Sequence, residues 1–338
     1  MREHLSTSRA IIGALALSLL VAPDLSADEG GKSLYLLGKR GPLAGLIPKP
    51  GWYATDDVYY YQADSSELVP IGGRVNQGVS VEALVNILQL TWITDINLGD
   101  ARLALGATLP YGQVRVDANA SALTPSGIPL ALAKSDDATG FGDPGLAASV
   151  GWKHRNGDLF RAWSIYSALF IPVGSYELGR IANLGGNRWG LDLGSAFTMG
   201  NFKRGRELSG VLGVTFNGEN KDTDYRSGTD LHLELAYRQH LPSGLAAGLA
   251  GYYFQQLTPD SGSSLLGDFK GRVAGIGPEI GYQFKAAGRT MGIDFRWYYE
   301  FAAQNRVEGN AFFLTFSLPL QRDPPGTSKL DEQQESSL

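Results

Sequence analysis

Alternation of apolar and polar residues with a period of two limits what this chain can fold into. From Gly51 onwards the sequence divides into segments of about ten residues separated by turn-forming residues. In 231–240, for example, Leu and Tyr side chains occupy every second position, and His, Glu and Arg side chains fall between them. The segments 290–300 and 145–154 follow the same pattern. It indicates β-strands with one apolar and one polar face.

The connections between these segments predict a closed barrel in a membrane. Short links that contain Gly or Asn alternate with longer ones near 64–78, 117–144, 173–187, 218–228, 258–269 and 302–308. Outer-membrane barrels have short periplasmic turns, longer external loops and an even number of strands. We expect strands near 51–63, 79–95, 101–116, 145–154, 160–172, 188–200, 206–217, 229–240, 245–257, 270–285, 290–301 and 309–320. The predicted fold class is all-β, a transmembrane antiparallel up-and-down barrel of about 12 strands of the outer-membrane type.

A soluble β-sandwich would also alternate, so two further features favour the membrane. The polar face of many strands carries charge, which a packed sandwich core would not tolerate unpaired. Aromatic residues also gather near the expected strand ends, as in the girdles at the two bilayer interfaces. They are Trp52, Tyr53, Trp92, Tyr111, Trp152, Trp189, Tyr252, Tyr253, Trp297 and Tyr298.

The N-terminus predicts export. Arg2 and Arg9 flank a short n-region, the run over 10–22 is apolar apart from Ser18, and a region with small residues follows up to Ala27. That run is shorter than the ~20 residues that a membrane-spanning helix needs, so it is typical of a cleaved signal peptide. We therefore expect a location in the cell outer membrane.

Four segments follow from these observations. We expect a signal peptide at 1–27, a periplasmic arm or a lumen plug at 28–50, the barrel at 51–320, and a disordered periplasmic tail at 321–338. The net charge of −5 makes nucleic acid an unsuitable partner. The expected partners are outer-membrane lipid and lipopolysaccharide, the barrel-assembly machinery and a small hydrophobic solute.

Strand parity predicts which side chains face the lumen. Mixed charges on the inward face suggest cross-strand ion pairs, some of them lining a solute path. The expected lumen-lining residues are Asp192, His232, Glu234, Arg238, Glu279, Asp294, Arg296 and Glu300. Apolar residues of the expected long loops either form an external mouth that receives a solute or pack as a lid over the lumen. They are Leu123, Ile128, Leu130, Leu132, Leu265 and Leu266.

Catalytic, nucleotide and metal sites receive little support. His154 and His240 abut short turns, and His232 lies near an external loop with no nucleophile beside it in sequence, so no catalytic residue is assigned. The GFGDPG motif at 140–145 matches a dinucleotide fingerprint, but an alternating strand follows it instead of a helix. Loop carboxylates lack calcium-loop spacing, the mature chain offers no zinc-thiolate ligand, and we expect neither metal nor cofactor. These carboxylates are Asp136, Asp137, Asp143, Asp222, Asp224 and Asp260.

Several local motifs resemble a known family. Gly140–Asp143 opens a strand, Pro172–Tyr176 closes one, and Gly186–Gly190 begins the next. The motifs at 223–228, 255–262 and 276–280 follow in the same order. In this arrangement the chain, from about Gly51 to Leu320, resembles the outer-membrane barrels named for the meta-pathway of phenol degradation, which include SphA-like sphingosine-induced proteins. The resemblance implies a transporter that admits hydrophobic or aromatic compounds, linked to aromatic degradation or to a lipid response.

The function expected from the sequence is passive uptake of hydrophobic or aromatic small molecules by a non-enzymatic barrel. Two alternatives stay open. One is an outer-membrane enzyme that modifies lipid, in which His232 would be required. The other is a structural or adhesion barrel with a sealed lumen. Solute flux distinguishes the transport barrel from both.

Overall fold

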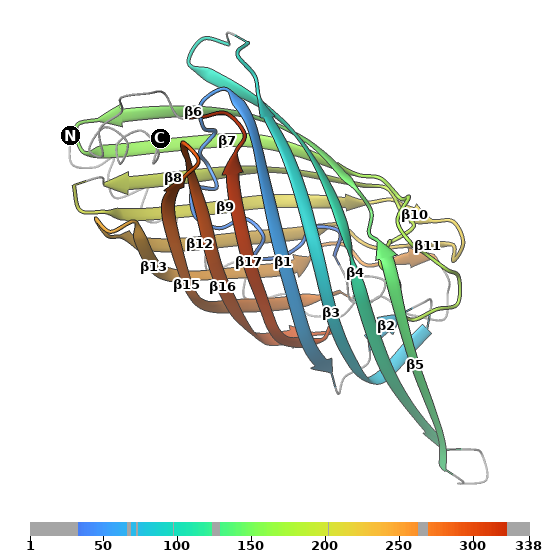
Figure 1. Cartoon of the computed structure of the whole chain (residues 1–338). Helices are drawn as coiled ribbons and strands as arrows, with labels where there is room; N and C mark the ends of the chain where they lie inside the picture. The colour runs from blue at the N-terminus through green and yellow to red at the C-terminus, as the bar shows by residue number, and fades with distance from the viewer. Residues whose placement is uncertain are drawn as a thin grey trace, which may run out of the picture.

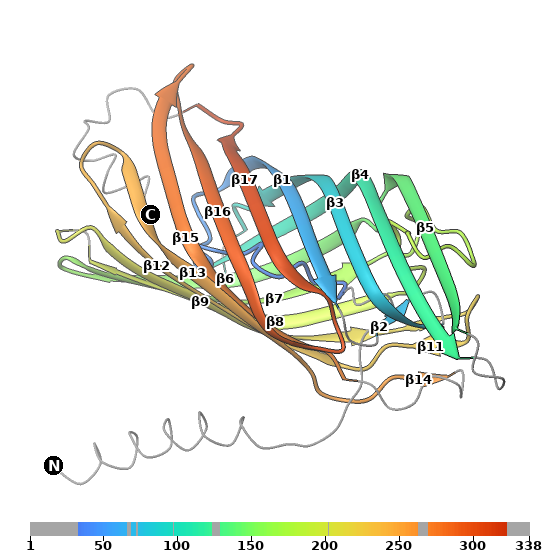
Figure 2. The ribbon, with the colours of Figure 1, turned by 90° about the horizontal axis from the view of Figure 1, so that it is seen from below.

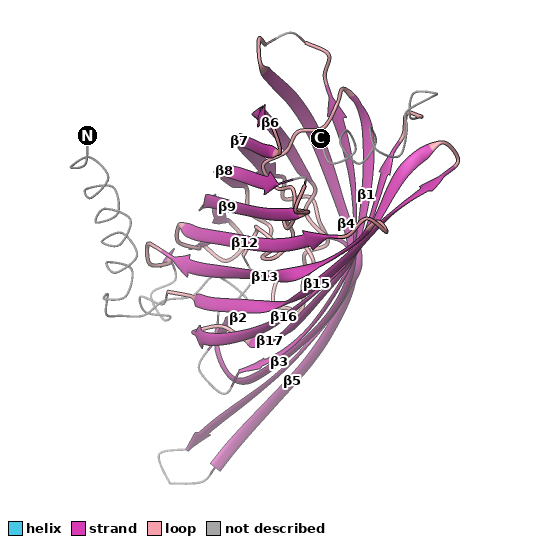
Figure 3. Ribbon diagram, turned by 90° about the vertical axis from the view of Figure 1, so that its left-hand side faces the viewer, coloured by secondary structure: helices cyan, strands magenta, loops and turns pink. Residues whose placement is uncertain are grey.

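Every regular element of the chain is a β-strand in the part that the structure describes. The computed structural model describes residues 33–65, 69–71, 74–96, 98–123, 129–201, 203–262 and 270–322. Among them there is no helix that could cross a membrane (Figure 3). The expected signal peptide at 1–27 lies outside the described residues, as does the expected tail from residue 323 onwards.

Twelve of the described strands close into one antiparallel ring, which confirms the predicted fold class (Figure 1). In ring order they are β1 (Gly51–Ser65), β3 (Arg74–Ile93), β4 (Ala101–Leu123), β6 (Gly145–Asn156), β7 (Leu159–Phe170), β8 (Gly190–Asn201), β9 (Arg206–Asn217), β12 (Asp230–His240), β13 (Leu245–Gln256), β15 (Arg272–Ala286), β16 (Arg289–Gln304) and β17 (Glu308–Pro319). Consecutive members of the ring pair, and β17 pairs with β1 to close it. Closure leaves no unpaired sheet edge in the ring.

The short and long connections lie at opposite ends of the ring, here called the short-turn rim and the long-loop rim. Each short connection contains a glycine with positive φ, the conformation that such turns require. These glycines are Gly99, Gly157, Gly205, Gly244 and Gly288. The turn positions read from the sequence are therefore those of the structure.

The expected long loop at 117–144 is mostly strand, which corrects the sequence prediction. β4 continues to Leu123, and β5 (Pro129–Phe141) pairs with it in register from Tyr111↔Phe141 to Leu123↔Pro129. This hairpin reaches beyond the neighbouring wall (Figure 1). The two strands satisfy each other's backbone groups, so they do not need the apolar alternation of a lipid-facing strand. Four shorter strands lie in other expected loops: β2 (Val69–Ile71), β10 (Glu219–Asn220), β11 (Tyr225–Arg226) and β14 (Ser261–Gly262).

The alternation places apolar side chains outside and polar ones inside. In β12 the residues from Asp230 to Arg238 alternate between buried and more accessible positions, with Asp230, His232, Glu234 and Arg238 all buried. Leu235 and Tyr237 are exposed on the outer face. This arrangement suits a lipid environment around the barrel.

Three aromatic residues assigned to the girdles from the sequence face the interior instead, and one of them, Tyr53, packs against Ile47 and Ile93. Tyr252 and Tyr298 are buried in an internal cluster, whereas Trp297 is exposed on the outer face. Because adjacent side chains of a strand point to opposite faces, Trp297 and Tyr298 cannot both belong to a girdle. At the short-turn rim, Trp52 stacks on Trp92 with ring centroids 5.8 Å apart, which fits an interfacial position.

The outer face also contains a polar pair. Asn86 Nδ2 donates to Asp56 Oδ1 at 2.8 Å between β3 and β1. Asp56 pairs across the sheet with Leu88 on one side and Phe316 on the other. The outer surface is therefore not uniformly apolar on this side of the ring.

We predict that charge on the lipid-facing surface is costly in proportion to its depth. Leu235 lies midway along β12 and is 46% exposed, so Leu235→Arg should lower the free energy of unfolding by about 2–4 kcal/mol. Leu241, in the turn after β12, is 44% exposed, and Leu241→Arg should cost about 0–1 kcal/mol. Urea titration of the protein folded in lipid vesicles measures both values. Equal costs for the two variants would contradict the assignment of this face to lipid.

Candidate functional site in the barrel lumen

The described part of the N-terminal segment, residues 33–50, lies inside the ring (Figure 2). It is here called the lumenal segment. The sequence left open whether this region is a periplasmic arm or a plug. In the structure its backbone is bonded to side chains of the barrel wall at several points, and these contacts position the site.

Arg296 of β16 holds one turn of the lumenal segment. Its Nη1 donates to Gly38 O at 2.8 Å and to Lys39 O at 2.7 Å, while Nη2 donates to Thr315 Oγ1 at 2.8 Å. Gly38 has a φ of 77°, and a Cβ at this position would come within 2.7 Å of the Tyr298 ring. Glycine is therefore required both for the backbone conformation and for the close approach.

Glu234 of β12 binds the same turn from the other side. Its Oε1 accepts a hydrogen bond from Tyr35 Oη at 2.9 Å and another from Gly38 N at 2.9 Å. The Tyr35 ring stacks on His232 with centroids 3.6 Å apart. His232 Nε2 in turn lies 3.0 Å from Asp192 Oδ1. Strands β8 and β12 thus form one polar surface against which the lumenal segment is packed.

Further along, the lumenal segment crosses β9 and β8. Leu43 N donates to Glu207 Oε1 at 2.6 Å, and Gly45 N donates to Thr198 Oγ1 at 3.0 Å. A Cβ at Gly45 would lie 2.5 Å from the backbone carbon of Phe197, so the segment approaches the wall as closely as glycine permits. Arg102 of β4 donates to Pro48 O at 2.7 Å where the segment leaves the lumen.

The lumenal segment brings its own titratable groups. Burial lowers the pKa of Lys39, although Asp57, 3.8 Å away, favours its charged form. Burial, reinforced by the charge of Glu234, raises the pKa of Tyr35 well above its ordinary value. The Tyr35 hydroxyl therefore stays protonated at neutral pH and acts as the donor to Glu234.

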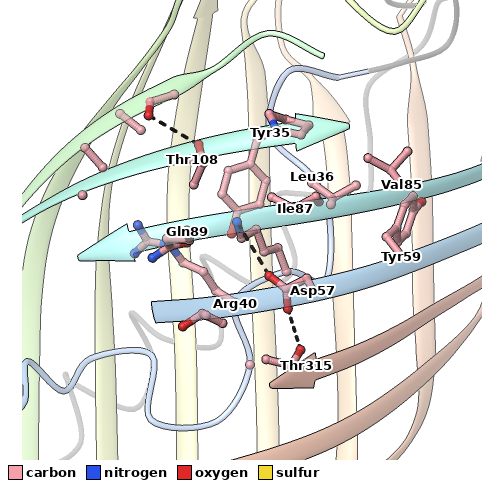
Figure 4. Close-up of a pocket in the computed structure, with 18 of the residues that line it drawn as sticks. Tyr35, Leu36, Arg40, Asp57, Tyr59, Val85, Ile87, Gln89, Thr108 and Thr315 are labelled. Carbon is pink, nitrogen blue, oxygen red and sulfur yellow. Dashed lines mark hydrogen bonds and ion pairs between the residues drawn. The ribbon is translucent and has the colours of Figure 1, made fainter. Parts of the chain in front are cut away.

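Between the lumenal segment and the opposite wall lies a cavity of about 1060 Å³ (Figure 4). The lumenal segment covers part of the charged wall from β8 to β16, and the largest continuous part of the cavity wall is formed by β1, β3 and β4. The inward side chains of β3 that line the cavity include Val81, Ala83, Val85 and Ile87, and those of β4 include Val114 and Val116. The cavity is therefore largely apolar along β3 and β4, and it also borders charged side chains of the wall such as Arg238 and Glu300.

The cavity extends between the two rims. At the long-loop rim it is lined by Tyr176 and Ile181 of the connection 171–189. At the short-turn rim it is lined by Gln283, Gln321 and Arg322. One continuous space thus follows the axis of the barrel beside the lumenal segment.

All eight residues expected at the lumen lie on the inward side of the wall, in two groups. Asp192, Arg238, Asp294, Arg296 and Glu300 line the cavity. His232, Glu234 and Glu279 are buried in the wall or beneath the lumenal segment and do not line it. Arg238 pairs with Glu279 at 3.1 Å and with Asp294 at 2.7 Å, which are cross-strand ion pairs of the expected kind.

The expected external mouth is only partly described. Ile128, Leu265 and Leu266 lie outside the described residues, and Leu123, Leu130 and Leu132 are described only as members of β4 and β5. Their role at a mouth stays a prediction. The connection 171–189 is described, and several of its residues line the cavity at the long-loop rim.

Two carboxylates hold that connection in place. Asp143 accepts hydrogen bonds from Gly174 N at 2.9 Å and from Gly186 N at 2.6 Å. Asp136 pairs with Arg180 at 2.9 Å and accepts from Ile181 N at 3.1 Å. The GFGDPG motif therefore joins β5 to β6 and anchors a loop. Within the described residues no group of three or more His, Asp or Glu side chains is arranged to hold a metal.

Sequence reasoning missed the acids and bases contributed by the lumenal segment and by β1. Asp57 accepts from Thr315 Oγ1 at 2.5 Å and lies near both Lys39 and Arg296. Its inward position was readable from strand parity in 51–63. The partners of Asp57 could not be predicted, because the sequence of the lumenal segment has no periodicity that fixes its path.

The architecture defines a class of protein. A closed antiparallel ring with an exposed apolar outer face and an axial cavity has the form of an outer-membrane barrel of the channel type. The family model described as "Putative MetA-pathway of phenol degradation" matches residues 65–316, and the chain belongs to this family. No curated protein matches the chain significantly.

A solved structure supports the fold. The COG4313 outer membrane channel from Pseudomonas putida F1 aligns with a TM-score of 0.62 at 15% identity, covering 84% of this chain and 99% of that one. OccK1 (OpdK) from Pseudomonas aeruginosa covers 80% of this chain and 98% of that one, at 9% identity with a TM-score of 0.33. The translocator domain of the autotransporter NalP from Neisseria meningitidis covers 80% and 89%, at 9% identity with a TM-score of 0.36. TM-scores as low as the last two do not support a shared topology.

We predict that Arg296→Met loosens the lumenal segment. The substitution leaves the carbonyls of Gly38 and Lys39 without their donor, and an unpaired buried polar group costs about 1–3 kcal/mol. Because the chain contains no cysteine, Ala44→Cys supplies a single labelling site on the segment. Maleimide labelling of Ala44→Cys should be several-fold faster in the Arg296→Met background. Arg289→Met, at the start of β16, is the control, and equal labelling rates in the two backgrounds would contradict the anchoring role.

Proposed function

We propose that this protein is an outer-membrane channel that admits small hydrophobic or aromatic molecules by diffusion through its lumen. The observation on which this rests is the axial cavity of about 1060 Å³ with a wall of Val, Ala and Ile side chains. Its volume lies just above the range of small-molecule sites, about 300–1,000 Å³. An apolar solute gains free energy in such a space because it leaves water.

The lumenal segment accounts for the proposed preference for hydrophobic over polar solutes. The barrel wall between β8 and β16 is rich in charge, so an empty barrel would favour polar solutes. The lumenal segment binds those charges through its own backbone, as in the contacts of Arg296 and Glu234. The space that it leaves is bounded mainly by the apolar wall. Membership of a family named for phenol degradation is consistent with an aromatic solute.

The surroundings follow from the same architecture. We propose that the outward Leu and aromatic side chains contact outer-membrane lipid, with lipopolysaccharide at the long-loop rim and the short-turn rim towards the periplasm. Insertion by the barrel-assembly machinery after cleavage of an N-terminal signal peptide belongs to the same proposal.

The geometry at His232 does not favour a lipid-modifying enzyme. The His232 ring is 1% exposed and is covered by the stacked ring of Tyr35. Among the described residues, no Ser or Thr hydroxyl is hydrogen-bonded to it. A catalytic histidine must reach its substrate and its nucleophile, so the contacts of His232 support an anchoring role.

We predict that filling the cavity blocks uptake. Val85 lines the cavity, so Val85→Trp should reduce protein-dependent uptake of toluene by cells at least several-fold. The neighbouring Leu84 is exposed on the outer face, and Leu84→Trp on the same strand should leave uptake unchanged. Radiolabelled toluene uptake, corrected for the amount of folded barrel, measures both. Equal uptake by the two variants, or uptake that does not depend on the protein, would contradict the proposal.

A further inference from the structure

Arg306 and Arg40 are among the arginines on the cavity that form no ion pair with a described residue. Most cations of the lumen are paired: Lys39 with Asp57, Arg238 with Glu279, and Arg296 with Asp57. Arg306 and Arg40 also line the cavity. Neither forms an ion pair or donates a hydrogen bond to another described residue.

Arg306 is the more informative of the two. It lies in the connection between β16 and β17, at the long-loop rim, and is only 7% exposed. Its Nε and Nη1 are buried without a hydrogen-bond acceptor. The guanidinium lies over the Phe254 ring, 4.4 Å from the centroid. A guanidinium is charged at every accessible pH, so two buried donors without acceptors are unfavourable in this position of the side chain.

Glu300 does not relieve that cost. Its charge acts on Arg306 through space, but both carboxylate oxygens are already engaged. Oε1 accepts from Tyr252 Oη at 2.7 Å, and Oε2 accepts from Tyr61 Oη at 2.7 Å and from Gly309 N at 3.1 Å. Glu300 therefore accepts its hydrogen bonds from other donors and none from the Arg306 guanidinium.

Apolar and aromatic side chains surround this cation. Tyr61, Val307 and Ile181 line the same end of the cavity. Deeper in, Val81, Val85 and Ile87 continue the apolar surface along β3. A molecule that fits here has a compact apolar body and, at one end, an acceptor group for the guanidinium.

We propose that Arg306 binds the anionic group of an amphipathic solute, a monocarboxylate with an aromatic or short aliphatic body, at the long-loop end of the cavity. The carboxylate supplies acceptors to the two unpaired donors after a change of the Arg306 rotamer, and the apolar wall receives the body. This inference rests on the proposed transport function and names the solute class.

Arg40 provides a second position for the same group. It lies on the lumenal segment, and its guanidinium stacks on Tyr166, 3.7 Å from the ring centroid. Figure 4 labels it among the residues that line the cavity, together with Gln89 of β3 and Asp57 of β1. An anionic group released from Arg306 can next pair with Arg40. A neutral solute forms an ion pair with neither arginine.

The test compares benzoate with benzamide, its neutral analogue of nearly the same shape. Isothermal titration of the full-length barrel in detergent micelles measures the affinity for each. The unmodified protein should bind benzoate more tightly than benzamide. Arg306→Gln should weaken benzoate binding at least about tenfold, because a hydrogen bond to a charged group is lost, and should leave benzamide binding unchanged. Arg306→Lys keeps the charge without the planar fork and should fall between the two.

Arg161→Gln is the matched control, since Arg161 is exposed and does not line the cavity. The heat-dependent gel shift of the folded barrel verifies each variant, and if Arg306→Gln fails to fold, Arg306→Lys carries the comparison. Benzoate affinity that is the same in all variants, or an equal loss for benzamide, would overturn the inference while leaving the channel intact. Benzamide binding and toluene uptake that persist without any benzoate preference contradict only the solute class. Loss of all protein-dependent uptake contradicts the proposed function itself.

Discussion

The need to pair every backbone amide and carbonyl inside lipid governs this structure. No described residue lies in a helix that could meet that need, so the strands meet it by closing into a ring in which β1 pairs with both β3 and β17. Closure makes each strand face lipid on one side and the lumen on the other. The outer side then selects Leu and aromatic residues such as Leu235 and Trp297, and the inner side is free to carry charge.

Charge in the lumen creates a second requirement, because buried ions must be paired or hydrogen-bonded. Part of it is met between strands, as in the Arg238–Glu279 pair. The rest is met by the lumenal segment, whose backbone supplies acceptors to Arg296 and a donor to Glu234. The contacts that stabilise the wall also remove polar surface from the lumen. The largely apolar lining of the cavity therefore depends in part on how the charges of the wall are satisfied.

The arginines of the lumen differ in how many of their hydrogen-bond donors have acceptors. This difference separates residues that stabilise the fold from residues that are available to bind a solute. Arg296 donates three hydrogen bonds and has a carboxylate nearby, so only its Nε lacks an acceptor. Arg306 has an aromatic ring beneath it and two donors without acceptors. The two residues belong to one strand and its following connection, and on sequence alone they are equivalent. Their different surroundings suggest that a charged lumen residue is best assigned a role from its unfilled hydrogen bonds.

The sequence by itself determined the ring and the direction of most side chains. Local alternation and turn-forming glycines such as Gly157 and Gly244 are short-range features, so the strand count and the inward position of His232 and Glu234 could be predicted. The β4–β5 hairpin was taken for a loop because strands outside lipid need no alternation. Only the tertiary structure decided that Tyr35 and Gly38 meet Glu234, and that Arg306 lies over Phe254 beside the cavity. These contacts join residues far apart in the chain through segments without periodicity, and only the closed ring brings them together.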